Sequence, residues 1–219
     1  MDVGPATPVR KDIRTTRGLA LALPIEPGEH VVVVGEGHLS LARSLASTGA
    51  RATVLCGKDD VSGLRPRIDA RATEPGEAWP IAGPADHAIV SSRSPGWLET
   101  SGRELRRLVR PGGHVVIACP ATPPSRRRLD ALLRDLQSGG FRVDARYGVR
   151  QDLHDVRHLV PISGPALWWY LRNSFLPWSR RAALLAALFG RIHASRLARR
   201  AFPAVATVLT RTRTGDSVC

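Results

Sequence analysis

The sequence predicts a doubly wound α/β domain, and three features support this prediction. Four consecutive valines, Val31–Val34, lead into a Gly-x-Gly turn at Gly35 and Gly37, and a helical pattern follows. Further short apolar runs alternate with helical patterns along the chain, separated by Gly and Pro turns. Buried parallel strands have continuous apolar runs, and alternation of this kind is typical of βαβ units. A nucleotide-type ligand is held at such a glycine turn, beside the first turn of the helix.

Seven segments have the composition of strands, and their boundaries are set by Gly, Pro or charged residues. They are His30–Val34, Ala52–Cys56, Ile68–Ala72, His87–Ser92, His114–Cys119, Phe141–Tyr147 and Pro203–Thr210.

Three helices are expected between these strands. The first has Leu41 and Leu45 on one face and ends at Gly49. Ser101 and Glu104 have capping-box spacing, which predicts that the second helix begins at Ser101. Ser125 is the predicted N-cap of the third helix. Its apolar face has helical spacing and consists of Leu129, Leu132, Leu133 and Leu136.

The chain of 219 residues has the size of one domain. Residues 1–18 are polar and are expected to form a loose lead-in, with one domain over residues 19–219. Residues 151–202 combine tryptophans with arginines and predict a basic helical insertion. Two interpretations of this insertion stay open: a lid over a substrate cleft, or a hairpin on a membrane surface.

The charge of the chain is positive and unevenly distributed. The net charge is +13, and residues 121–219 hold 17 basic but only 6 acidic residues. No acidic residue lies between Asp155 and Asp216. This half is expected to attract anions, either a small phosphate- or carboxylate-bearing molecule or an acidic membrane surface. Nucleic acid is the least favoured of the anionic partners.

The cysteines and the hydropathy pattern bear on location. Cys56, Cys119 and Cys219 are an odd number and far apart, which favours reduced thiols in a cytoplasmic protein. Their spacing is not that of a metal site, and no metal is expected. No apolar run approaches the roughly 18 residues of a membrane span. We therefore expect a cytoplasmic protein, with peripheral attachment to a membrane as the alternative.

Three segments resemble the class I S-adenosylmethionine-dependent methyltransferases. Leu105–Pro120 resembles the helix, Arg-Pro-Gly-Gly turn and fifth strand of that family. Gly28–Gly37 resembles its first strand and cofactor loop, and Ala85–Ser92 its fourth strand. The resemblance covers residues 19–148 and the last strand. It implies a Rossmann-like, seven-stranded, mostly parallel sheet with an antiparallel last strand, and S-adenosyl-L-methionine as cofactor.

The resemblance also implies where ligands bind, while no catalytic residue is assigned and the oligomeric state is left open. The candidate cofactor-binding residues are Gly35, Glu36, Gly37, Cys56, Gly57, Ser91 and Ser92. The candidate substrate-binding residues are Arg93, Trp97, His154, His158, Trp168 and Trp169.

The chain departs from the family pattern at three positions. Val33 replaces the usual acid two residues before the first glycine, and Leu39 replaces the third glycine. Cys56 stands near the position of the carboxylate that holds the ribose hydroxyls. A cofactor site without these carboxylates is expected to bind more weakly, because charge-assisted hydrogen bonds are lost.

The favoured function is methylation of a small, acidic molecule, and two alternatives remain. One is a methyltransferase-like protein that does not methylate and instead binds a partner or catalyses other chemistry in the same cleft. The other is an NAD(P)-dependent oxidoreductase. Gly35–Ser40 approximates the dinucleotide fingerprint with Ser40 as its small third member. Lys58 offers a charge for a 2′-phosphate, although a solvated loop lysine is the favoured interpretation.

Overall fold

The computed structural model describes residues 17–20, 22–35, 39–57, 68–149, 153, 156, 159–162 and 202–213. These residues form four helices and eight strands. The helices are α2 (Arg17–Ala20), α3 (Leu39–Ser47), α5 (Pro95–Leu108) and α6 (Pro123–Ser138). The strands are β1 (His30–Val34), β2 (Arg51–Cys56), β3 (Asp69–Ala72), β4 (Ala85–Ser91), β5 (Val109–Pro120), β6 (Phe141–Val149), β7 (Leu159–Pro161) and β8 (Ala204–Arg211).

All eight strands lie in one sheet, in the order β3-β2-β1-β4-β5-β8-β6-β7. The pairs from β3 to β5 are parallel, whereas β8 is antiparallel to both β5 and β6. The prediction of a mostly parallel sheet with an antiparallel last strand is confirmed. The prediction of seven strands was wrong, because Leu159–Pro161 pairs with the end of β6 as an additional antiparallel strand. Those three residues fall inside the segment expected to be helical, where Pro161 disfavours a helix.

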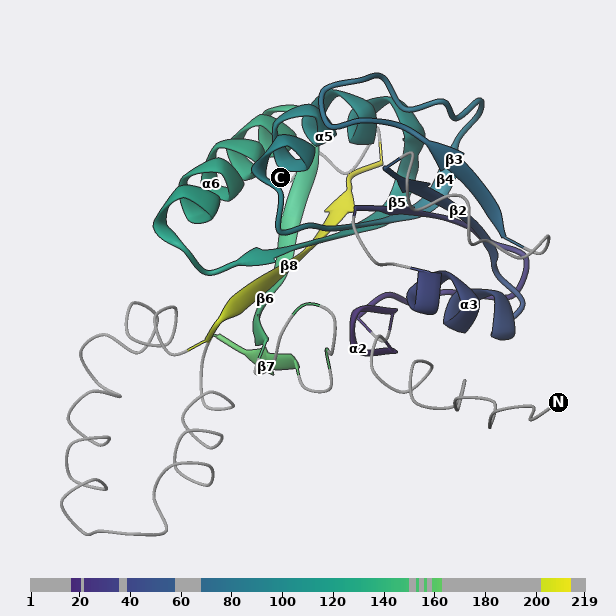
Figure 1. The fold of residues 1–219 in the computed structure, drawn as a ribbon, viewed down its shortest axis with the longest axis horizontal. Coiled ribbons are helices and arrows are strands. Elements are labelled where there is room, and N and C mark those ends of the chain that lie inside the picture. Colours follow the sequence, from purple (N-terminus) through teal and green to yellow (C-terminus); the bar gives the residue numbers. More distant parts are fainter. Residues whose placement is uncertain are drawn as a thin grey trace, which may run out of the picture.

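The sheet is covered on both faces, as its apolar strands require. Figure 1 shows α5 and α6 on one face and α2 and α3 on the other. Along β1, Val32 and Val34 pack with the α5–α6 core, whereas Val31 and Val33 pack with the α2–α3 core. Successive strand residues point to opposite faces, so a strand with valine at each of these positions is buried on both sides. This explains why the run has no polar alternation.

Two helices begin earlier than predicted. Helix α5 begins at Pro95, not at Ser101, because proline is well suited to the first helical position. Ser101 lies in the helix interior and its hydroxyl donates to the carbonyl of Trp97. Helix α6 likewise begins at Pro123, with Thr122 as its N-cap in place of Ser125. Ser125 is buried, and its hydroxyl accepts a hydrogen bond from the Thr122 hydroxyl at 3.0 Å.

The Pro-Gly-Gly sequence forms an irregularity at the start of β5. Ala85 pairs with Val109 and His87 pairs with His114, so β5 advances further than β4 between these two pairs. Gly112 adopts a φ of 83°, and a Cβ on Gly113 would lie 2.3 Å from the carbonyl oxygen of Asp86. Both positions therefore favour glycine, and the turn predicted here is a bulge within the strand.

The amino ends of the central strands are joined by polar side chains. His87 is 3% exposed, and its Nε2 atom lies 2.9 Å from Glu29. The His114 backbone N–H donates to His87 Nδ1 at 3.3 Å, so a neutral His87 ring carries its proton on Nε2, facing Glu29. The two histidine rings stack at 5.4 Å between centroids, and His114 Nδ1 lies 2.8 Å from the Thr210 hydroxyl. Arg110 also donates to Glu29, at 3.1 Å. This network connects Glu29, which precedes β1, with β4, β5 and β8.

We expect the free energy of unfolding to fall as the pH drops below about 6.5, the pH at which a histidine of the unfolded chain takes up its proton. Burial lowers the pKa of His114 from 6.5, and the charge of His87 lowers it further, against opposing effects of Asp144 and Glu29. In the unfolded chain a histidine takes up its proton near pH 6.5. The stability contribution is therefore present above that pH and is lost as the pH falls through the lower folded pKa. Urea unfolding at about pH 7.5 and about pH 5.5 measures the decline.

The matched variant for this measurement is His114→Gln, which keeps a polar side chain but does not titrate. The decline in unfolding free energy between the two pH values should be smaller in this variant than in the wild-type chain. An equal decline in both proteins would show that His114 does not contribute.

No helix among the described residues is long and apolar enough to span a membrane. Most of the lead-in at residues 1–18 and most of the insertion at residues 151–202 lie outside the described residues. Their predicted roles stay predictions.

Candidate cofactor site

The carboxyl ends of β1, β2 and β4 meet at one edge of the sheet. Val34, the last residue of β1, pairs with Leu55 on one side and with Val90 on the other. Gly35 therefore lies between the ends of β2 and β4. The strand order reverses at β1: β2 and β3 lie on one side of it, and β4 and β5 lie on the other side. Open α/β sheets bind ligands at such a switch point, outside the carboxyl ends of the strands.

Gly35 forms the corner that closes β1. Its backbone φ is 121°, a conformation that residues with a side chain rarely adopt, and its N–H donates to the carbonyl of Leu55 at 3.1 Å. The residue is buried. Because it is a glycine, the chain turns away from the sheet here without placing a Cβ at this edge. Glu36 and Gly37, which complete the predicted loop, lie outside the described residues. Of the predicted cofactor loop, the structure places Gly35 at the switch point.

The end of β2 holds two more predicted residues, and beside it lies Thr73, which follows β3 and which the sequence did not indicate. Cys56 is 2% exposed and packs in the α2–α3 core, and its carbonyl accepts a hydrogen bond from Thr73 N–H at 3.0 Å. A Cβ built on Gly57 would meet no atom within 4 Å. The Thr73 hydroxyl is buried and makes no hydrogen bond to the residues that the structure describes. The signal in the sequence was a single threonine after a weak strand, too little to indicate a site.

The end of β4 is organised by serines. Ser91 ends the strand, and the Ser92 N–H donates to the Ala118 carbonyl of β5 at 3.2 Å. The Ser92 hydroxyl accepts from the Ser94 N–H at 2.9 Å and donates to the Ser94 carbonyl at 3.1 Å. This closed turn positions Ser94 as the N-cap residue of α5. The Ser92 side chain thus shapes the turn, and its backbone lies at the edge.

The predicted substrate-binding residues lie in different places. Arg93 is exposed and follows β4 at the carboxyl edge. Trp97 is 2% exposed and packs in the hydrophobic core beneath α5, so the structure does not bring it to the surface of this edge. The other four predicted residues lie outside the described part of the chain, and they are His154, His158, Trp168 and Trp169.

This edge consists of glycines and small polar residues, with few charges among the residues that the structure describes. Gly35 has a positive φ, a Cβ on Gly57 would meet no atom within 4 Å, and the buried Thr73 hydroxyl makes no hydrogen bond to a described residue. Val33, which stands where an acid is usual, is fully buried in the α2–α3 core. Among the described residues, no three His, Cys, Asp or Glu side chains are grouped to hold a metal ion. These residues therefore fit a cofactor that is held largely through backbone groups.

No protein-family model matches the sequence, and no curated protein matches it. Several solved structures are similar to the chain. An S-adenosylmethionine-dependent methyltransferase from Mesorhizobium loti is 15% identical, with a TM-score of 0.53 over 89% of this chain and 96% of that one. Fibrillarin from Aeropyrum pernix with natively bound S-adenosyl-L-methionine is 17% identical, with a TM-score of 0.50 over 68% of this chain and 74% of that one. The [4+2]-cyclase SpnF is 15% identical, with a TM-score of 0.53 over 96% of this chain and 84% of that one.

The strand order separates this fold from the dinucleotide-binding alternative. A dinucleotide-binding sheet continues from its fifth to its sixth strand without interruption, whereas here the antiparallel β8 lies between β5 and β6. The chain has the fold of the class I S-adenosylmethionine-dependent methyltransferases.

Proposed function

We propose that the chain is an S-adenosylmethionine-dependent methyltransferase that acts on a small, anionic molecule. The observation that supports this most strongly is the position of Gly35. Its left-handed backbone corner lies at the switch point of the sheet, between the ends of β2 and β4. A ligand there is met by backbone groups of three strands instead of by side chains.

Four described residues of the edge have a role in this proposal. When bound, S-adenosylmethionine supplies an electrophilic methyl group. Gly35 would let the backbone approach the cofactor, and Gly57 would leave space beside the end of β2. Ser91 and the Ser92 turn would form the opposite wall, next to the end of β5. Transfer then requires that the wall positions an acceptor atom in line with the methyl group.

The proposed substrate class rests on charge. The chain has a net charge of +13, and the exposed Arg93 lies at the edge itself. Guanidinium groups bind carboxylate and phosphate through paired hydrogen bonds. A membrane surface with anionic lipids is the other partner that this charge suits, and it is distinguished by sedimentation with anionic and neutral vesicles.

A second candidate is a protein of this fold that performs no methylation. Two observations favour it: none of the described residues assigned to the site, Gly35, Cys56, Gly57, Ser91 and Ser92, carries a carboxylate, and the similar SpnF structure is that of a [4+2]-cyclase. Under this alternative the same cleft would bind its ligand without transferring a methyl group.

Calorimetric titration tests the proposal against both alternatives. S-adenosylmethionine and S-adenosylhomocysteine are each expected to bind with a stoichiometry of one per chain. They are expected to compete for the same site, because they share the adenosyl group. NADPH is expected not to bind, because the fold lacks the dinucleotide strand order. Binding of NADPH but of neither adenosyl compound would overturn the proposal. Binding of both adenosyl compounds without methyl transfer to any of a panel of small acids would favour the second candidate.

A further inference from the structure

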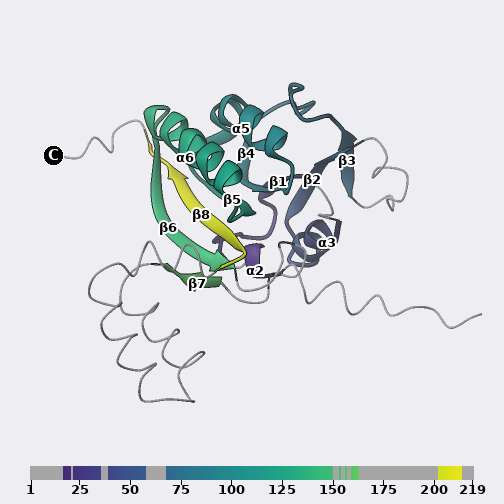
Figure 2. The same ribbon diagram turned by 60° about the vertical axis from the view of Figure 1, so that its left-hand side comes forward.

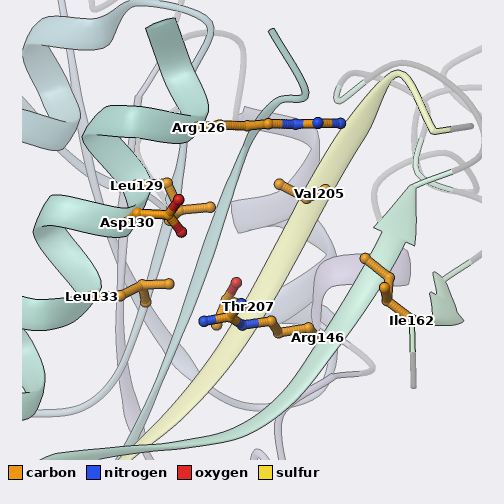
Figure 3. Close-up of a pocket in the computed structure, with 8 residues that line it drawn as sticks. All are labelled: Arg126, Leu129, Asp130, Leu133, Arg146, Ile162, Val205 and Thr207. Carbon is orange, nitrogen blue, oxygen red and sulfur yellow. The ribbon is translucent and has the colours of Figure 1, made fainter. Parts of the chain in front are cut away.

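The connection between β3 and β4 contains no helix. Helix α3 joins β1 to β2 and α5 joins β4 to β5, whereas residues 73–84 pass from β3 to β4 without regular structure. Figure 2 shows this β3–β4 crossing as an irregular ribbon. On the same side of the sheet, α6 packs so closely that the hollow between α6 and β8 in Figure 3 has a volume of only about 40 Å³. The crossing has no such helix packing and depends on other contacts.

Two arginines hold the second half of the crossing. Arg107 of α5 donates from Nη2 to the Trp79 carbonyl at 3.1 Å and from Nη1 to the Ile81 carbonyl at 3.0 Å. Arg71 of β3 donates to the Pro80 carbonyl between them. The side chains of Trp79 and Ile81 are buried in the α5–α6 core. Backbone carbonyls outside helices and strands need such partners, and here three successive ones are held from two elements.

Arg107 is oriented by Glu104, one turn earlier in α5. The Glu104 side chain is 3% exposed, and its Oε2 atom accepts from Arg107 Nε at 3.0 Å and from Nη2 at 2.8 Å. Arg103 also donates to Glu104, at 3.4 Å, but its side chain is 70% exposed. A guanidinium group is a rigid planar fork. The buried carboxylate therefore directs the Arg107 fork toward the two carbonyls of the crossing.

The first half of the crossing borders the candidate cofactor edge. The Thr73 N–H donates to the Cys56 carbonyl at the end of β2, at 3.0 Å. Pro75 lies against the start of α5, because a Cβ built on Gly96 would come within 2.8 Å of the Pro75 Cβ. Residues 73–75 thus reach from the end of β2 to the helix that follows β4. The Thr73 hydroxyl is buried there and makes no hydrogen bond to a described residue.

We propose that Glu104 and Arg107 are a positioning pair for the cofactor edge and act on it through the β3–β4 crossing. This inference rests on the proposed function. The pair fixes the second half of the crossing, so that Thr73 at its beginning keeps one position beside the end of β2. A loop that is already ordered adds less entropic cost to binding than a loop that the ligand must order. The pair contributes to affinity in this way without touching the cofactor.

The test compares Arg107→Lys with the matched control Arg103→Lys in the full chain. Each variant keeps a positive charge beside Glu104, which protects the fold. A lysine ammonium is a single point of charge and does not reproduce the fork that joins the carboxylate to two carbonyls. Arg107→Lys is expected to weaken S-adenosylhomocysteine binding about threefold to tenfold, measured by calorimetry. Arg103→Lys should leave the affinity unchanged.

Amide hydrogen exchange reads the crossing without any ligand. Exchange of the Thr73 N–H should become faster in Arg107→Lys and stay unchanged in Arg103→Lys, because local opening of the crossing exposes this group. Equal exchange rates in the two variants would overturn the proposal.

Urea unfolding separates positioning from a purely structural role. If Arg107→Lys lowers the free energy of unfolding but binds S-adenosylhomocysteine as tightly as Arg103→Lys, the pair acts on stability alone and the proposal is overturned. Failure of the proposed function is seen separately, in the wild-type titration. A wild-type chain that binds no S-adenosylhomocysteine contradicts that function, and the role of the pair falls with it.

Discussion

Replacing Gly35 with alanine is expected to weaken S-adenosylhomocysteine binding by about tenfold to a hundredfold. The residue has a φ of 121°, where an L side chain is strained by on the order of 1–3 kcal/mol. The strain is relieved if the corner moves, and movement withdraws the backbone from the switch point between β2 and β4. The dissociation constant, measured by calorimetry on the folded variant, gives the loss directly.

The control for this variant is Gly28→Ala. Gly28 also has a left-handed backbone, with a φ of 88°, and a Cβ there would meet no atom within 4 Å. It lies in the turn before β1, at the other end of the strand, so the same strain should lower stability without changing affinity. Equal losses of affinity in the two variants would mean that Gly35 acts only through stability. Unchanged affinity in Gly35→Ala would remove this corner from the site.

Introducing an aspartate at Gly57 is expected to tighten S-adenosylhomocysteine binding by about tenfold to a hundredfold. A carboxylate at the end of β2 would form charge-assisted hydrogen bonds with ribose hydroxyls, worth about 1.5–3 kcal/mol each. Gly57 is the better position for this change than Cys56. A side chain at Gly57 enters open space, whereas Cys56 is 2% exposed and packed in the core.

Gly57→Ala separates charge from bulk in this experiment. Alanine fills the same space without a carboxylate, so its affinity should match that of the wild-type chain. If Gly57→Asp binds no more tightly than Gly57→Ala, the ribose does not lie at the end of β2.

The sequence was most informative where local chemistry and tertiary packing require the same residues. Val31–Val34 is buried on both faces, so its continuous apolar pattern identified β1 with correct boundaries. Strand β8 was also predicted nearly in full, because its apolar residues pack in the two hydrophobic cores on opposite faces of the sheet.

The sequence was less informative where one local signal could serve two purposes. Ser101 and Glu104 have capping-box spacing, yet both are helix-interior residues, and the buried Glu104 pairs with Arg107 at 2.8 Å. The proline at position 95 decided where that helix begins. Strand β7 has only three residues, too short for a periodic pattern, and it exists because the end of β6 offers an open edge.

The candidate site was predictable at its backbone and not at its side chains. A Gly-x-Gly turn after a buried strand indicated Gly35, because a backbone corner with positive φ at the end of a strand favours glycine. The buried hydroxyl of Thr73 follows β3, and its position beside Cys56 depends on the pairing of β3 with β2 in the sheet. No spacing rule links such residues.

A crystal structure with S-adenosylhomocysteine tests directly whether the carboxyl edge around Gly35 holds S-adenosylmethionine. The ligand is expected at the switch point, against the backbone of Gly35, with Gly57 on one side and Ser91 and Ser92 on the other. A ligand bound elsewhere on the chain, or an edge that stays empty at saturating S-adenosylhomocysteine, would contradict it.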